Sequence, residues 1–204
     1  MKRIITIQHC QSEHHVNKMV GGVTDWPLTE LGLKQADNIG RALKQKLGDT
    51  SGYKMYSSDL KRASQTAEMV AKHLGLTPEL HRELREINLG SATGKSGEWL
   101  NLNKTPCPEG VSWMYHRLLP DAETNAEMYE RISGFVDMLE KSEDENIIVV
   151  AHGACLQMFA ARWLKLSVKI MENTSIFGSS GGVSFMSERK DLVRVLNVWN
   201  DTSY

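Results

Sequence analysis

Two short apolar runs, each followed by a histidine, constrain the fold of this chain more than any other feature. Residues 4–7 lead through Gln8 into His9, and residues 147–151 lead directly into His152. Short runs rich in isoleucine and valine are typical of strands that are buried on both faces, as in α/β proteins. In such folds ligands bind beyond the carboxyl ends of the strands. We therefore expect both histidines at one functional edge of one sheet.

Helical and extended patterns alternate along the rest of the chain, which predicts an α/β layered fold. The sequence Ser57-Ser58-Asp59 is a typical N-terminal signal for the second long helix. The first residues after His9 are polar and are predicted to form a loop. We predict four long helices, over residues 29–47, 59–74, 125–140 and 154–164. Two further short strands are predicted at residues 54–56 and 79–81. Residues 183–186 and 192–199 are predicted to form a C-terminal hairpin.

The length of 204 residues, with 41% hydrophobic and 24% charged residues, predicts a single globular domain. Residues 95–122 are uneven, with three prolines among tryptophan and tyrosine residues. Long segments of this kind are usually lids or binding loops. We expect a partly helical, lid-like insertion. Its residues Trp99, Trp113, Tyr115, His116 and Arg117 either line a substrate pocket or, for the aromatic ones, form the core of the insertion.

Composition excludes several other classes of protein. The formal net charge is -1 and the basic residues are scattered, so we expect no nucleic-acid partner. No apolar run approaches the roughly 20 residues that a membrane helix needs. The three cysteines are odd in number and far apart, which favours reduced thiols. The first strand leaves no room for a signal peptide, and we expect a cytoplasmic protein.

The strand-end histidines belong to a set of residues suited to phosphoryl transfer. Taken singly, each is open to a structural role, and Arg62 to that of a solvated helix charge. Together, a neutral imidazole such as His9 can attack phosphorus, and an arginine in the first turn of a helix can bind the phosphoryl oxygens. A carboxylic acid, for which Glu86 is available, must then protonate the leaving oxygen.

Five segments resemble, in the same order, motifs of the histidine phosphatase superfamily, which includes the phosphoglycerate mutases. They are residues 22–32, 57–67, 84–90, 149–153 and 200–203, so the resemblance covers nearly the whole chain. The resemblance implies a three-layer α/β/α sandwich with a mostly parallel central sheet. It also implies a metal-independent phosphatase without a cofactor that acts on a small phosphorylated metabolite.

The resemblance also assigns roles to individual residues. His9 would be the nucleophile that becomes phosphorylated, with its other ring nitrogen held by a backbone carbonyl. Arg62 and His152 would bind the phosphoryl oxygens. Glu86 would protonate the leaving group and later activate water, with Glu83 as a nearby alternative.

Ser12 stands where the family usually has threonine, and its hydroxyl can keep the same role toward phosphate. Gly22 would let the backbone approach the substrate. The chain departs from the family in its opening motif, where Arg-His-Gly is replaced by Gln8-His9-Cys10. Gln8 can donate a hydrogen bond to phosphate but brings no charge, and an arginine that stabilises a transferring phosphoryl group can contribute about 10³–10⁵ in rate.

Two further departures lie at His15, where the family often has asparagine, and at Thr93, where it often has glutamate. The loss of the arginine leaves either a weakened phosphate-binding site or a site with another donor. We hypothesise that a protonated His14 or His15 replaces the missing charge, in which case activity should favour mildly acidic pH.

Several alternatives stay open at this stage. A mutase-type isomerase is the second candidate, although the chain length favours the small phosphatases. A binding module that holds a phosphorylated ligand is the third. A metal site built from the histidines is the fourth, but their spacing matches no familiar ligand pattern. The sequence identifies neither the natural substrate nor the oligomeric state, and it leaves open whether the chain forms a homodimer.

Overall fold

The two histidine-terminated strands lie side by side at the centre of the sheet. A computed structural model describes residues 1–204, and in it β1 (Arg3–Gln8) and β4 (Asn146–Ala151) are parallel neighbours. Ile4 lies opposite Ile147, and Gln8 lies opposite Ala151. The residue that follows each strand is a histidine, so this register brings both histidines to the same sheet edge, as predicted.

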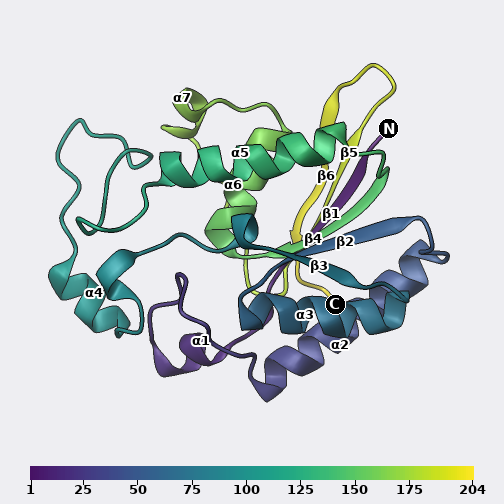
Figure 1. Ribbon diagram of the computed structural model, residues 1–204, viewed down its shortest axis with the longest axis horizontal. Coiled ribbons are helices and arrows are strands. Elements are labelled where there is room, and N and C mark those ends of the chain that lie inside the picture. Colours follow the sequence, from purple (N-terminus) through teal and green to yellow (C-terminus); the bar gives the residue numbers. More distant parts are fainter.

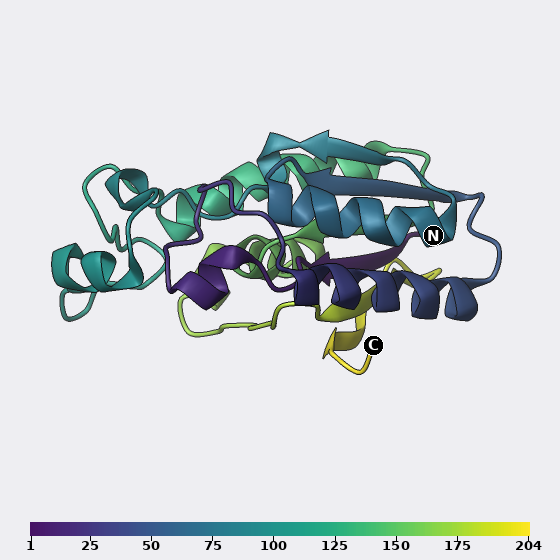
Figure 2. The same ribbon diagram turned by 90° about the horizontal axis from the view of Figure 1, so that it is seen from below.

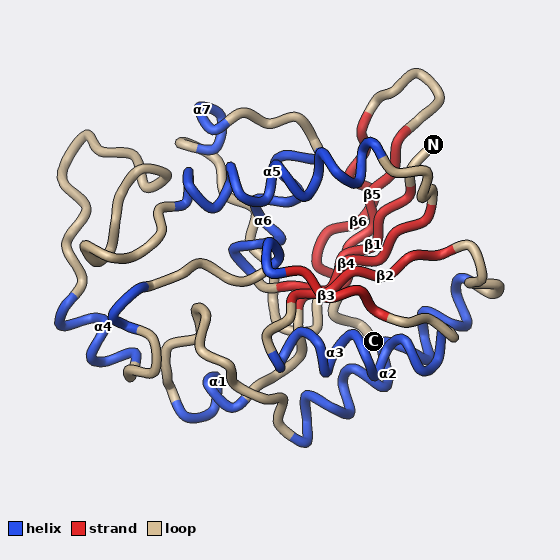
Figure 3. The backbone as a smooth tube through the Cα atoms, viewed as in Figure 1, coloured by secondary structure: helices blue, strands red, loops and turns tan.

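The sheet has six strands in the order β3-β2-β4-β1-β5-β6 (Figure 3). Strands β2 (Tyr53–Ser58) and β3 (Pro78–His81) extend it in parallel from β4. On the other side, β5 (Val183–Glu188) and β6 (Arg194–Asp201) form the predicted antiparallel hairpin beside β1. The sheet is therefore mostly parallel with an antiparallel edge.

Two pairs of helices cover the two faces of the sheet and complete the three layers (Figures 1 and 2). One face carries α2 (Glu30–Leu47) and α3 (Lys61–Leu74), and the other carries α5 (Asn125–Lys141) and α6 (Gly153–Trp163). Successive side chains of a strand point to opposite faces. Accordingly Ile4 packs in the core with α5 and α6, whereas Ile5 packs with α2 and α3. Both positions are apolar because both faces are buried.

The start of α3 differs from the prediction. Ser57 and Ser58 belong to β2, and the helix begins at Lys61 without a side-chain cap from its own N-cap residue. The free N–H of Lys61 instead donates to Asp25 Oδ1 at 2.7 Å, from a loop 36 residues earlier. A cap donated by a distant loop leaves no local sequence pattern.

Four short elements were not predicted from the sequence. Helix α1 (Glu13–Asn17) occupies the segment after His9 that was expected to be a loop, and α7 (Val168–Met171) follows α6. Two single turns of 3₁₀ helix, Arg82–Leu84 and Gly90–Ala92, lie in the segment between β3 and α4. Helices of four or five residues are too short to show a 3.6-residue periodicity, so pattern analysis misses them.

The segment 95–122 contains one helix, α4 (Gly97–Asn103), and is otherwise irregular, as predicted. It lies apart from the sheet, at the left of Figures 1 and 2. A β-bridge between Met19 and Ser96 ties its start to the loop after α1. Trp99 packs against a small third core, and the indole of Trp113 donates to Met171 O. None of the helices has both the length and the apolar character required to cross a bilayer.

Candidate active site

His9 is held as a neutral imidazole whose Nε2 is unprotonated. Its Nδ1 lies 2.8 Å from Cys10 O, and since a carbonyl can only accept, Nδ1 carries the hydrogen. Nε2 therefore presents its lone pair, which accepts the Nε–H of Arg62 at 3.2 Å. Burial, together with the charge of Arg62, holds the pKa of His9 well below its usual range. The backbone-carbonyl contact expected from the family resemblance is present.

Arg62 is buried and is bound through all three of its nitrogens. Besides His9, its Nη1 donates to Thr24 O and its Nη2 to Gly22 O, both at 2.7 Å. Burial lowers the pKa of Arg62 to about 10, so it remains a cation at neutral pH. The loop at residues 22–25 thus holds this cation directly beside the nucleophile.

Gly22 contacts both Ile87 and Arg62. Its backbone has φ +42° and approaches Ile87, and its expected approach to the substrate stays a prediction. A Cβ at this position would lie 3.2 Å from Ile87 O. Because its own carbonyl binds Arg62, Gly22 positions the arginine.

His152 lies beside His9, with their ring centroids 5.1 Å apart. Its Nε2 is 2.9 Å from Ser58 Oγ, whereas its Nδ1 is buried without a hydrogen-bond partner. Burial and then Arg62 lower the pKa of His152, so it too is neutral near pH 7. An orphaned polar nitrogen is costly in a folded protein, and a bound phosphoryl group can supply a partner.

Ser12 positions two further histidines next to His9. Its Oγ lies 2.6 Å from His14 Nδ1, and its backbone N–H donates to His15 Nδ1 at 3.1 Å. Because Nδ1 of His15 accepts, the neutral ring carries its hydrogen on Nε2 and is a donor there. The His15 ring stacks on His9 at 5.5 Å with an interplanar angle of 14°. In this structure the Ser12 hydroxyl positions His14, and its role toward phosphate stays a prediction.

The hypothesis that a protonated histidine replaces the missing arginine charge is not supported by the structure. Burial, then His15 and Arg62, lowers the pKa of His14 to about 3. Burial, followed by Arg62, also lowers the pKa of His15. The site therefore offers neutral imidazole donors and one cation.

The Glu86 side chain lies at the N-terminus of α6, the helix that begins directly after His152. Its Oε1 accepts from Ile87 N at 2.9 Å and from Cys155 N at 3.2 Å, and its Oε2 accepts from Ala154 N at 3.1 Å. These N–H groups fix the carboxyl group. Glu83, the alternative acid, points elsewhere: it lies 3.6 Å from His81 Nδ1, and its side chain is 53% exposed. The fixed position near the histidines favours Glu86 over Glu83.

The two substituted positions of the opening motif are accommodated without strain. A Cβ added to Gly153 would lie 3.4 Å from Gln8 Nε2, which places the Gln8 amide against the start of α6. Cys10 is buried, does not have positive φ, and donates its N–H to Thr66 Oγ1. Burial raises the pKa of the Cys10 thiol to about 12, so it is a packing residue rather than a nucleophile.

A loop that no sequence pattern indicated holds the backbone of His9. Ser180 Oγ donates to His9 O at 3.0 Å, and Gly181 N donates to Gln8 O at 3.1 Å. Asn200 Oδ1 in turn accepts from Ser179 N at 2.6 Å. Asn200 opens the C-terminal motif that supported the family resemblance, but no sequence signal indicated that it anchors this loop.

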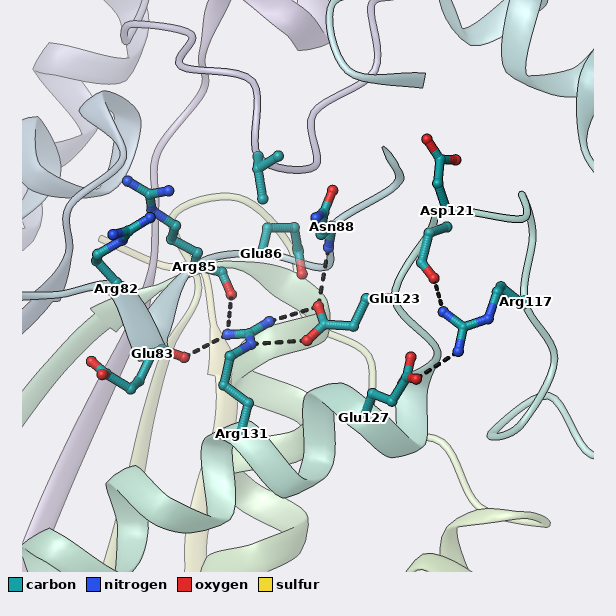
Figure 4. Close-up of a pocket in the computed structure, with 12 residues that line it drawn as sticks. Arg82, Glu83, Arg85, Glu86, Asn88, Arg117, Asp121, Glu123, Glu127 and Arg131 are labelled. Atoms are coloured by element: carbon teal, nitrogen blue, oxygen red, sulfur yellow. Dashed lines mark hydrogen bonds and ion pairs between the residues drawn. The ribbon is translucent and has the colours of Figure 1, made fainter. Parts of the chain in front are cut away.

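A charged pocket lined in part by Glu86 has a volume of about 650 Å³. Figure 4 shows its lining residues. Arg117 is the only residue of the predicted lining set that contributes to it. Tyr115 is exposed to solvent, and His116 Nε2 lies 2.9 Å from Thr105 O. The aromatic residues therefore do not line this pocket, and for Trp99 and Trp113 the alternative of a packing role holds. The lining residues, ten of them polar, are Val23, Arg82, Glu83, Arg85, Glu86, Asn88, Arg117, Asp121, Ala122, Glu123, Glu127 and Arg131.

The structure thus brings His9, Arg62, His152, His15 and Glu86 to one edge of the sheet. No three histidine, cysteine or carboxylate groups are arranged to hold a metal ion. The model of the histidine phosphatase superfamily, branch 1, matches residues 4–202. The chain belongs to the histidine phosphatase superfamily.

Known relatives in this superfamily include both phosphatases and mutases. The protein named putative phosphoserine phosphatase 2 of Hydrogenobacter thermophilus is 31% identical over 157 residues, covering 76% of this chain and 75% of that one. Glucosyl-3-phosphoglycerate phosphatase of Mycobacterium tuberculosis is 27% identical over 221 residues, covering 98% and 94%. A probable phosphoglycerate mutase of Yersinia pestis is 27% identical over 164 residues, covering 76% and 72%.

The fold is shared with solved structures as well. The native structure of mycobacterial glucosyl-3-phosphoglycerate phosphatase has a TM-score of 0.79 at 24% identity, covering 98% of both chains. This agreement confirms the predicted α/β fold.

Proposed function

We propose that this histidine phosphatase hydrolyses a phosphomonoester through a phosphohistidine at His9. The observation that carries the proposal is the tautomer of His9, whose Nδ1–H is held by Cys10 O so that Nε2 is the nucleophilic atom. The lowered pKa of His9 keeps that atom unprotonated at neutral pH. The phosphatase names of two relatives support hydrolysis of a small phosphorylated substrate.

In the first step, an incoming phosphoryl oxygen replaces His9 Nε2 as the acceptor of the hydrogen bond from Arg62 Nε–H. The lone pair of His9 Nε2 is then free to attack. Nε2 then forms the N–P bond while the bond between phosphorus and the ester oxygen breaks. Arg62 carries the positive charge that stabilises the equatorial oxygens, and the neutral His15 and His152 add hydrogen bonds. The nucleophile and the cation both belong to the protein, so we propose a metal-independent reaction.

Glu86 serves both proton transfers. In its protonated form it gives a proton to the leaving oxygen, and as a carboxylate it then takes one from the water that attacks phosphorus. The N–P bond breaks in this second step, and its electrons return to Nε2 of His9. The position of Glu86 at the N-terminus of α6, the end next to His152, supports this role.

The substitution at Gln8 should make the site a weak phosphate binder. The Gln8 amide lies against Gly153 beside His9, where an arginine would bring a second cation near Arg62. A single cation among neutral imidazoles stabilises transferring phosphate less than two would. Replacement of Gln8 by arginine is therefore expected to raise kcat/KM.

The test measures release of phosphate from an aryl phosphate by the wild type, His9→Ala, Gln8→Arg and a control, His73→Ala. His73 binds Asp37 and lies near the far end of α3, so its loss should leave turnover unchanged. We expect activity to vanish only in His9→Ala and to rise in Gln8→Arg. Turnover in His9→Ala equal to that of the control would refute the phosphohistidine route.

A mutase activity is the second candidate, because one relative bears that name. Incubation with 3-phosphoglycerate separates the two functions: a hydrolase releases inorganic phosphate, whereas a mutase interconverts the phosphoglycerates. We further propose a cytoplasmic location, which the three free cysteines support.

A further inference from the structure

We propose that the charged pocket of Figure 4 binds the leaving group of the substrate, and that this group is an uncharged polyhydroxylated alcohol. The inference rests on the proposed function, because it takes Glu86 as the acid that meets the leaving oxygen. The pocket includes Glu86 but none of His9, Arg62 and His152. It therefore lies on the acid's side of the site, where an in-line displacement directs the leaving group.

Two arginine–carboxylate pairs, in each of which the charges cancel, line the pocket. Arg131 binds both oxygens of Glu123, at 2.9 Å and 2.8 Å. Arg117 binds Glu127 Oε1 at 2.5 Å. Figure 4 shows the two pairs side by side.

Backbone groups hold these pairs rigidly. Arg131 also donates to the carbonyls of Glu83 and Arg85, at 2.6 Å and 3.0 Å. Glu123 accepts from Asn88 N at 3.1 Å, and Glu127 accepts from Thr124 N at 2.7 Å. The polar groups are thus fixed before any ligand arrives, which reduces the entropic cost of binding.

This construction discriminates among classes of leaving group. At these two pairs, a charged group would compete with one partner of an existing ion pair. An apolar group would remove water from the charged side chains and return no hydrogen bond, which is costly. A hydroxyl group both donates and accepts, so it can use spare carboxylate lone pairs without separating a pair. A volume of about 650 Å³ lies within the range of small-molecule sites.

Four phosphate esters of primary alcohols test the proposal, since they share similar leaving oxygens. They are glucose 6-phosphate, benzyl phosphate, O-phosphoserine and 3-phosphoglycerate, which carry polyhydroxylated, apolar, zwitterionic and anionic groups respectively. We expect kcat/KM for glucose 6-phosphate to exceed each of the others by about tenfold, the equivalent of one or two hydrogen bonds.

A double variant, Arg117→Ala with Glu127→Gln, removes one pair, and glutamine keeps the bond to Thr124 N. Its control is Arg189→Ala with Asp191→Asn, an exposed pair on the β5–β6 hairpin. We expect the ratio of kcat/KM for glucose 6-phosphate to that for benzyl phosphate to fall about tenfold in the pocket variant and to stay constant in the control.

The outcomes separate the two proposals. Preferred hydrolysis of benzyl phosphate, O-phosphoserine or 3-phosphoglycerate, still dependent on His9, would overturn the pocket assignment and leave the proposed function intact. An unchanged ratio in the pocket variant would also overturn it. Absence of hydrolysis with every ester would overturn both.

Discussion

Replacing Arg62 with lysine should destabilise the protein as well as impair phosphate binding. The guanidinium donates to Gly22 O, which is buried, and to Thr24 O, which is partly buried. A lysine ammonium can reach at most one of these carbonyls. A hydrogen bond to a charged group contributes about 1.5–3 kcal/mol. We therefore expect the free energy of unfolding to fall by about 2 kcal/mol, a substantial part of the ~5–15 kcal/mol of a typical domain.

The assay is urea unfolding followed by far-UV circular dichroism, with linear extrapolation to water. The matched control is Arg41→Lys, because Arg41 is 64% exposed and pairs only with neighbours on its own helix. Its effect should stay within about 0.5 kcal/mol. Equal stabilities of Arg62→Lys and Arg41→Lys would refute the argument that the arginine ties the 22–25 loop to the site.

Three further predictions follow from other features. Gly22→Ala should lower the free energy of unfolding by about 1 kcal/mol or more, since its φ is +42°. Gly134→Ala, in open space on α5, should raise the free energy of unfolding by up to about 1 kcal/mol. Urea unfolding that ranks the two variants in the opposite order would contradict this. Burial lowers the pKa of His9 and of His152, so the unfolded chain binds more protons below about pH 6.5 and stability should fall as pH drops from there; a midpoint of urea unfolding that stays constant down to about pH 5 would oppose this account. A thiol reagent should label one cysteine in the native protein and three after denaturation, because the three residues differ in exposure, with Cys107 exposed and Cys10 and Cys155 buried.

The sequence predicts the central strands and long helices well because their signals are local. The apolar residues at 147–151 indicate a buried strand whichever strands lie beside it. The apolar stripe of α2 predicts a helix from the spacing of its own residues alone. The family resemblance added the order of the motifs. The local patterns and the resemblance together predicted that His9, Arg62, Glu86 and His152 lie in one site. Neither predicted the contacts that hold these residues there.

The remaining features depend on contacts between residues far apart in the chain. Asp25 caps a helix 36 residues later, and Asn200 holds the loop against His9. The low pKa values of His14 and His15 come from burial and Arg62, which are tertiary properties. A pattern within one segment contains none of this information.

The pocket next to Glu86 illustrates the same limit. Tryptophan and tyrosine residues in the 95–122 segment suggested an aromatic pocket, yet Trp99 and Trp113 pack into the protein. The pocket is instead lined mainly by charged residues of two separate segments, 82–88 and 117–131, together with the apolar Val23. Their pairing into ion pairs could not be deduced from spacing.

Direct detection of a phosphohistidine tests the central claim most sharply. The protein is mixed with an aryl phosphate, quenched at alkaline pH because phosphohistidine is labile in acid, and analysed by intact-mass and peptide mass spectrometry. We predict one added phosphoryl group on His9 in the wild type, accumulating in Glu86→Gln if water attack is slowed, and none in His9→Ala. Turnover without any phosphorylated protein in either background, or a phosphoryl group on another residue, would contradict the account.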